Sequence, residues 1–325
     1  MAVATEAKPV RRRRRFESTG SAKLREALVG YAFIAVPMGF FLLFFIFPIG
    51  YAIYISFYDW GILGKIQYLG LQNYRDLIHD KAFWTWPPHI HAGSQNSAFW
   101  NTVYYTVIVV PTQMALGLVL ALAVNARIRG RTFFRAAYYF PSLTSSAAIT
   151  AVAIYILNSN GVLNSILSKI KGEEVNTPWF GQSGTALESI MGLNVWTTSG
   201  TMMLFYLATL QSIPTDVYEA AAIDGASRWR IFWRITFPLL KPGHFFVAVL
   251  SIIGCLKIFD QAFIVSGGKG GPAYSTETAV LYLYQTAIND QYWGYAAALG
   301  VVLFLIIFVI TLAQRLLFGK PEIGY

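Results

Sequence analysis

Long apolar stretches alternate with shorter polar connections along this chain. Six of the stretches are long enough to cross the hydrocarbon core of a bilayer, which is about 30 Å thick and requires about 20 residues in a helix. They cover approximately residues 30–56, 100–124, 136–157, 190–212, 243–266 and 293–314. Lipid offers no hydrogen-bond partner to a free backbone group, so spanning segments of this kind fold as helices. The pattern predicts an all-α integral membrane fold with six transmembrane helices.

The composition agrees with a membrane protein. Of the 325 residues, 55% are hydrophobic and 13% are charged, against about 25% charged residues in ordinary soluble domains. The formal charge of +9 could indicate a nucleic-acid-binding protein, but the basic residues lie between the apolar stretches. We therefore expect a lipid bilayer, and no nucleic acid, around this chain. The uncharged run from Ala27 to Tyr58 exceeds the roughly 7 to 15 residues of a signal-peptide core, which predicts an uncleaved anchor.

The distribution of Lys and Arg predicts the orientation of the spans. The N-terminus, the second and fourth connections and the C-terminal tail together carry eighteen of these residues, whereas the other connections carry six. Cytoplasmic loops are the ones rich in Lys and Arg, so both termini are expected in the cytoplasm. The chain then divides into a basic segment at 1–28, a six-span domain at 29–318 and a short tail at 319–325.

Aromatic residues and prolines add two smaller expectations. Tryptophans on the outer side suit an interfacial belt, with docking of an external partner as the alternative; they are Trp60, Trp84, Trp86, Trp100, Trp179 and Trp293. Prolines inside the spans predict kinks or local unwinding; they are Pro37, Pro48, Pro111 and Pro141.

The connection between the fourth and fifth spans is amphipathic and divided into two helical parts. Asp216, followed three residues later by Glu219, resembles a capping box that opens a helix. Gly225 can end this helix in a left-handed conformation. Ser227 can cap a second helix, and Pro238 is expected to stop it.

These residues resemble the EAA loop of binding-protein-dependent ABC importer permeases. The family pattern is Glu-Ala-Ala, three residues, Gly, and then Ile-x-Leu-Pro. The matching positions are Glu219, Ala220, Ala221, Gly225, Ile235 and Pro238, with Phe237 replacing the usual Leu. The order of the spans, and the connection at 267–276, are similar to the maltose-type, carbohydrate-transporting branch.

The resemblance implies a type I ABC importer permease in a prokaryotic inner membrane. The chain would form half of the pathway for a sugar or oligosaccharide that an extracytoplasmic binding protein delivers. A second homologous permease and two ATPase subunits would complete the complex. The loop at 213–242 would couple to an ATPase subunit through Glu219, Ala220, Ala221, Asp224, Gly225, Arg228 and Pro238.

No cofactor or catalytic group is expected in this chain. Gly268 and Lys269 lack the upstream Gly and the following Ser or Thr of a phosphate-binding loop, so ATP and Mg would be bound by the ATPase subunits. His89 and His91 lie close together, but nothing nearby completes a metal shell. The single cysteine, Cys255, is interpreted as a buried apolar residue.

A polar stripe in the fourth span is the first candidate for substrate binding. Polar groups at membrane depth are costly and tend to face a cavity or a partner. Asn194, Thr197, Thr198 and Thr201 recur at i, i+3, i+4 and i+7. Trp196, just off this stripe, could stack on a sugar ring. The alternative is that the threonine hydroxyls bond to their own helix and permit close packing.

A second polar stripe lies in the fifth span. It contains Gly254, Lys257, Asp260 and Gln261 at helical spacing. Lys257 and Asp260 could form a purely structural ion pair. The family resemblance instead implies that this segment lines the sugar site, so that both stripes face one cavity in the outer half of the bundle.

Three rival functions fit parts of the sequence. Within the family, the substrate could be a phosphorylated polyol such as glycerol 3-phosphate, with Lys257 as the anion partner. A secondary transporter driven by an ion gradient would leave the segment from Glu219 to Pro238 unexplained. A membrane receptor without transport activity is the third alternative.

Overall fold

The computed structural model describes residues 20–86, 97–126 and 129–318. The chain divides into two compact units, Met1–Ala52 and Ile53–Tyr325. The first unit contains α1 (Gly20–Phe41), a π-helical turn η1 (Leu42–Ile46) and the beginning of α2 (Phe47–Ile55). The helix α1 continues through Pro37, whereas η1 directly precedes the turn that contains Pro48, so the expected local unwinding of the first span occurs before Pro48 and not at Pro37. The domain boundaries expected at residues 28 and 318 stay predictions.

The second unit is predominantly helical. Its elements up to the centre of the bundle are β1 (Tyr58–Gly61), β2 (Gly64–Tyr68), α3 (Gln72–Ile78), α4 (Lys81–Trp84), α5 (Ala98–Asn125), α6 (Arg131–Leu143), α7 (Ser146–Ile156), α8 (Val162–Lys171) and α9 (Ala186–Ser212). They are followed by α10 (Thr215–Ile223), α11 (Arg228–Ile231), η2 (Phe232–Thr236), α12 (Phe237–Leu239), α13 (Lys241–Leu256), α14 (Asp260–Ser266), α15 (Ala279–Tyr284), η3 (Gln285–Asn289) and α16 (Trp293–Phe318). The antiparallel hairpin β1–β2 is an exception to the all-α expectation.

Several helices of the described residues are long and apolar enough to cross a membrane. Four such stretches are Leu24–Ile55, Ala98–Asn125, Lys241–Ser266 and Trp293–Leu316, and the pair α6–α7, bent by 95°, could form a fifth. This bend follows Pro141, whereas α5 continues through Pro111. The helix α9 has 27 residues but carries the polar stripe and is not among the four. The structure thus has the helices of a multi-pass membrane protein, and the count of six stays a prediction.

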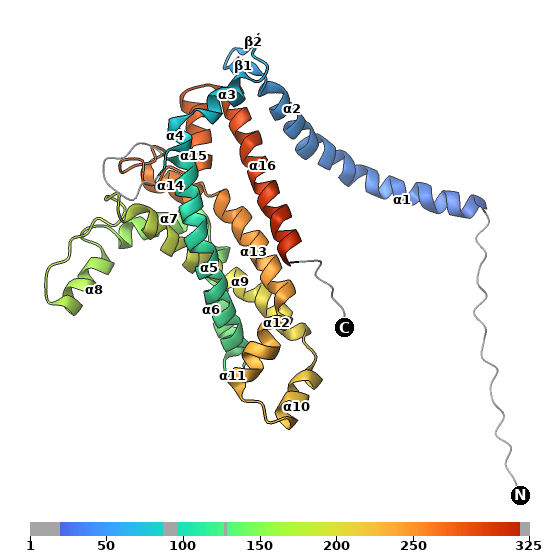
Figure 1. Cartoon of the computed structure of the whole chain (residues 1–325), viewed down its shortest axis with the longest axis vertical. Coiled ribbons are helices and arrows are strands. Elements are labelled where there is room, and N and C mark those ends of the chain that lie inside the picture. The colour runs from blue at the N-terminus through green and yellow to red at the C-terminus, as the bar shows by residue number, and fades with distance from the viewer. Residues whose placement is uncertain (1–19, 87–96, 127–128, 319–325) are drawn as a thin grey trace, which may run out of the picture. The chain divides into compact units, whose positions relative to one another are not determined.

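The helix α9 lies at the centre of the second unit, packed against α5, α6 and α13. Buried apolar residues of α5, α9 and α13 form one core cluster, which includes Ala121, Met203 and Val247. A Cβ atom added at Gly200 would overlap the carbonyl oxygen of Tyr138, so α9 and α6 are in backbone contact there. In Figure 1 the hairpin β1–β2 and the pair α10–α11 lie at opposite ends of this bundle.

Asp80 joins the short helices near the hairpin to the last two helices. Its Oδ1 accepts a hydrogen bond from the Ala82 amide (2.9 Å) and thereby caps α4, while its Oδ2 accepts from the hydroxyls of Tyr282 and Tyr295, each at 2.6 Å. Burial, helped by the bond to Asp80, raises the pKa of Tyr282, so its hydroxyl remains a donor at neutral pH. One carboxylate therefore holds α4, α15 and α16 together.

Replacing Asp80 with alanine is expected to destabilise the protein by about 3 to 6 kcal/mol, because it removes the two tyrosine hydrogen bonds, and hydrogen bonds to a charged group contribute about 1.5 to 3 kcal/mol each. Thermal unfolding of the purified protein in detergent measures the effect. Asp76→Ala is the control, since among the described residues this exposed carboxylate accepts a hydrogen bond only from Gln72 in the same helix. Equal unfolding temperatures for the two variants would contradict the role of Asp80.

Candidate functional site

The end of α10 has the left-handed turn that the sequence predicts. Gly225 has a φ of +68°, a conformation that costs other residues energy. The Gly225 amide donates to the Ala222 carbonyl (3.1 Å), and the Ala226 amide donates to the Ala221 carbonyl (3.0 Å). These two bonds are those of a Schellman motif. The expectation that Gly225 ends this helix is confirmed.

The beginning of α10 differs from the prediction. The N-cap residue is Pro214, with no side-chain capping bond, so the capping box proposed for Asp216 and Glu219 is wrong. The helix begins one residue before Asp216, which places this carboxylate in the first turn, where it interacts favourably with the helix dipole. The cap of the next helix is as expected, because the Ser227 hydroxyl accepts from the Arg230 amide at 3.4 Å.

Pro238 does not stop the second helix. The chain passes through η2, in which the Phe237 amide donates to the Phe232 carbonyl five residues earlier, and continues to Leu239. This wider turn shifts the backbone hydrogen bonds just before the proline. Pro238 then lies in the first turn of α12, where a missing N–H group is tolerated. Pro238 thus marks a local change in the helix, but this change is a π-helical turn and not the end of the helix.

Most predicted coupling residues lie at the surface. Glu219, Ala220, Asp224, Gly225, Arg228 and Pro238 are exposed, and Ala221 is buried. Apolar side chains of the same segment are also exposed, among them Ile223 at 87% and Trp229 at 73%. Tyr218 and Phe232 face the other way and pack against the core cluster of α5, α9 and α13. The segment is thus attached to the bundle on one side and presents charged and apolar groups on the other.

The polar stripe of α9 is divided between the helix itself and α5. The hydroxyl of Thr197, a buried residue, lies 3.0 Å from the Asn194 carbonyl oxygen, so this residue shows the alternative arrangement, bonding within its own helix. The Thr198 Oγ1 atom lies 2.7 Å from the Asn194 carbonyl oxygen and 2.7 Å from the Gln113 Oε1 atom on α5. Asn194, Thr198 and Thr201 are half-buried.

Gln113 was not predicted, yet it connects three helices. Its side chain is only 2% exposed. It accepts from Thr198 on α9, and its Nε2 atom lies 3.9 Å from the Cys255 Sγ atom on α13. An amide in the middle of a predicted span is the signal that could have identified it, because such a group needs a partner at membrane depth.

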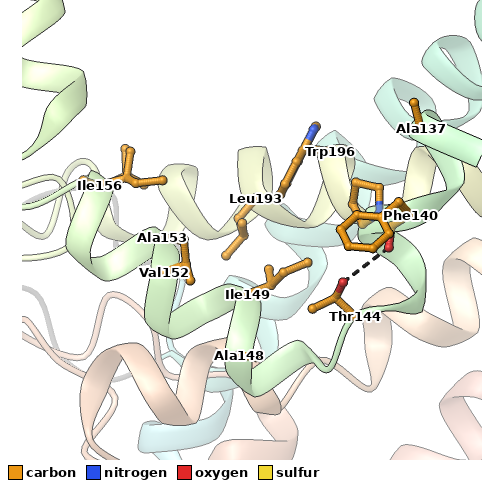
Figure 2. A pocket seen from close by; sticks show the side chains of 12 residues that line it. Ala137, Phe140, Thr144, Ala148, Ile149, Val152, Ala153, Ile156, Leu193 and Trp196 are labelled. Carbon is orange, nitrogen blue, oxygen red and sulfur yellow. Dashed lines mark hydrogen bonds between the residues drawn. The ribbon is translucent and has the colours of Figure 1, made fainter. Parts of the chain in front are cut away.

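Trp196 lies apart from the stripe. Its side chain is 55% exposed and lines an open groove of about 540 Å³ between α9 and the bent pair α6–α7 (Figure 2). Phe140, Ile149 and Leu193 are among the other lining residues, and the hydroxyl of Thr144 in this groove already donates to the Phe140 carbonyl. None of the stripe's Asn and Thr side chains lines this groove, so the structure does not bring Trp196 together with them.

The second stripe is interrupted. The helix α13 ends at Leu256 and α14 begins at Asp260, so the assumed continuous helical spacing from Gly254 to Gln261 is wrong. Gly254, Lys257 and Asp260 are exposed, and Gln261 is half-buried. Lys257 and Asp260 form no ion pair in the structure. The break at the end of α13 therefore leaves both charges at the surface.

The two stripes are linked only indirectly in the described part of the chain. Gln113 connects Thr198 with Cys255, two residues before Lys257. No hydrogen bond joins Asn194 or Thr201 to Lys257 or Asp260 within the described ranges. The histidine pair predicted to be without a metal lies outside these ranges.

Comparisons with known proteins identify the family. Residues 113–320 match the family of binding-protein-dependent transport system inner membrane components. The multiple sugar-binding transport system permease protein MsmF of Streptococcus mutans is 30% identical over 295 residues, which cover 90% of this chain and 96% of that protein. The arabinooligosaccharides transport system permease protein AraP of Bacillus subtilis is 32% identical over 293 residues, 89% of this chain and 88% of that protein.

A solved structure agrees with the fold. A chain of a bacterial alginate ABC transporter, crystallised in complex with an alginate pentasaccharide-bound periplasmic protein, has a TM-score of 0.76 at 22% identity. The match covers 90% of this chain and 94% of that chain. The protein belongs to the family of binding-protein-dependent transport system inner membrane components. It is a multi-pass permease subunit, a transport component rather than an enzyme, and the resemblance noted at Glu219 to Pro238 is confirmed.

Proposed function

We propose that this chain is a permease subunit of an ATP-driven importer for a sugar or oligosaccharide. An extracytoplasmic binding protein delivers the solute, and a second homologous permease supplies the other half of the pathway. Two ATPase subunits, which bind ATP and Mg, drive the transport cycle. The names of the relatives MsmF and AraP, and the alginate transporter with its periplasmic protein, support this substrate class and this kind of partner.

The observation that carries the proposal is the segment from α10 to α12. Its residues match the EAA pattern. The face of the segment that is turned away from the bundle presents Glu219, Asp224 and Arg228 beside the exposed Ile223. A surface that combines charged groups with an uncovered apolar side chain suits a protein partner. We place this segment, and both termini, on the cytoplasmic side, where it docks on an ATPase subunit.

The same orientation accounts for six spans. The bent pair α6–α7 is the third span and α9 is the fourth, since a helix of 27 residues extends about 40 Å at 1.5 Å per residue. The hairpin β1–β2 then lies on the outer side, at the end of the bundle opposite to α10 (Figure 1). The substrate site is placed between the α9 stripe and the surface formed by Lys257, Asp260 and Gln261.

Isolation of the intact complex tests the proposal. We expect purification in mild detergent, followed by mass spectrometry, to recover a non-identical permease, an ATPase and a solute-binding protein. Vesicles that contain this complex are expected to take up sugar only when ATP is supplied on the side of the membrane that carries the ATPase subunits. Uptake by the chain alone in an ion gradient would support a secondary transporter instead, and competition by glycerol 3-phosphate but not by neutral sugars would indicate the phosphorylated substrate.

Replacing Thr198 with valine is expected to lower sugar uptake about threefold to tenfold, because one hydrogen bond in a water-poor site contributes about 0.5 to 1.5 kcal/mol. The measurement is initial uptake into vesicles at matched amounts of complex. Thr112→Val is the control: within the part of the chain that the structure describes, this exposed hydroxyl on α5 bonds only to the Ile108 carbonyl of its own helix. If both variants transport equally well, the bond between Thr198 and Gln113 has no part in the site.

A further inference from the structure

One side-chain pair connects the coupling segment with the central helix. His244 lies in the first turn of α13, and its Nδ1 atom is 2.9 Å from the Tyr206 hydroxyl oxygen on α9. The ring of Phe237, from the end of the coupling segment, lies 4.5 Å from the His244 ring, centroid to centroid. The imidazole therefore contacts the coupling segment on one side and α9 on the other.

Contacts continue from Phe237 back to α10. The preceding residue, Thr236, is 5% exposed, and its hydroxyl donates to the Tyr218 hydroxyl on α10 at 3.3 Å. Tyr218 also packs against the core cluster that contains Tyr206 and Leu240. A continuous series of contacts thus runs from α10 through η2 and α12 to His244 and α9.

The helices α9 and α13 are in close contact beside this pair. A Cβ atom added at Gly243 would lie 2.7 Å from the Thr209 Oγ1 atom, which is shorter than an ordinary van der Waals contact. The start of α13 therefore has little freedom to move against α9, and packed elements of this kind shift together rather than deform. A displacement at Phe237 is expected to reach α9 through these contacts.

A histidine at position 244 lowers the stability of the fold, compared with an apolar ring of similar size. Its Nε2 atom is buried and makes no hydrogen bond within the described ranges, although the Phe237 backbone interacts with the ring, and a buried polar atom without a hydrogen bond destabilises a fold. A phenylalanine ring would pack against Phe237 without this cost. A phenylalanine would lose the hydrogen bond to Tyr206 and the polar interaction with the Phe237 backbone.

We propose that His244 is a positioning residue that transmits movement of the coupling segment to α9 through its hydrogen bond to Tyr206. This inference rests on the proposed function. Tyr206 follows Thr201 by five residues, or about 7.5 Å along the helix, so α9 carries both the receiving residue and the polar stripe. Movement on the ATPase side then changes the position of the stripe, and occupancy of the stripe changes the free energy of binding on the ATPase side in return, as linkage requires.

The ratio of sugar taken up to ATP hydrolysed tests this role, in vesicles that contain the full complex and the binding protein. Loss of folded complex lowers uptake and hydrolysis in proportion and leaves the ratio unchanged, whereas loss of transmission lowers the ratio. We expect Tyr206→Phe and His244→Phe each to lower it about threefold to tenfold, the effect of one hydrogen bond. The double variant is expected to lower it no further, because both changes remove the same interaction.

Two further variants complete the test. In His244→Asn the amide can still form a hydrogen bond to Tyr206. This variant is expected to recover at least half of the difference between the transport ratio of His244→Phe and that of the wild type. Tyr105→Phe is the matched control, since it removes a buried tyrosine hydroxyl that has no partner among the described residues, and the wild-type ratio is expected. Wild-type ratios in Tyr206→Phe and His244→Phe would overturn the role of His244 while leaving the proposed function intact. Absence of ATP-driven uptake in the wild-type complex would instead overturn the proposed function.

Discussion

Replacing Gly225 with valine is expected to abolish the stimulation of ATP hydrolysis by substrate-loaded binding protein. The native φ of +68° lies in the left-handed region, which costs a residue with a Cβ about 1 to 2 kcal/mol and a β-branched residue more. A Cβ atom at Gly225 would meet nothing within 4 Å, so the effect is conformational rather than a clash. The turn would open, and the Schellman bonds to Ala221 and Ala222 would be lost.

Gly225→Asn is the matched control, because asparagine tolerates the left-handed region. We expect this variant to keep most of the stimulated hydrolysis, although its side chain is larger than hydrogen. Glu219→Lys tests the same surface by charge reversal without a backbone effect, and it is also expected to abolish stimulation. Stimulation that is lost equally with valine and asparagine would mean that the space at Gly225, not its conformation, matters.

Replacing Gly200 with alanine is expected to prevent stable packing of α9 against α6. The added methyl group would overlap the Tyr138 carbonyl oxygen, and a backbone atom cannot move aside as a flexible side chain can. Overpacking of this kind typically costs about 1 to 3 kcal/mol and can cost more. The gain in helix propensity from Gly to Ala, about 0.8 to 1 kcal/mol, is too small to offset a clash with backbone.

Gly192→Ala provides the comparison on the same helix. A Cβ atom there would meet nothing within 4 Å, so only the gain in propensity remains, and wild-type or slightly higher stability is expected. The yield of monodisperse protein in detergent and its unfolding temperature measure both variants. Equal behaviour of the two would show that α6 and α9 are not in backbone contact at Gly200.

Features that depend on a few neighbouring residues were determined by the sequence itself. The left-handed turn at Gly225 and the cap at Ser227 form as predicted, because each depends on local backbone preference and one nearby hydrogen bond. The apolar stretches can also be predicted from the sequence, because a long apolar segment in lipid must satisfy its backbone hydrogen bonds within a helix. The resemblance to the EAA loop also required only the residues from Glu219 to Pro238 and their spacing.

Features that depend on distant segments were decided by the tertiary structure. No local pattern shows that Gln113 would meet Thr198, a residue 85 positions later, or that Trp196 would turn into an apolar groove. The break between Leu256 and Asp260 likewise separates residues that an ideal helix would align. His244 had no sequence signal, because its partners Phe237 and Tyr206 lie on two other helices. A side chain's role in this bundle follows from which helices pack beside it, and the free energy of that packing is shared among residues far apart in the chain.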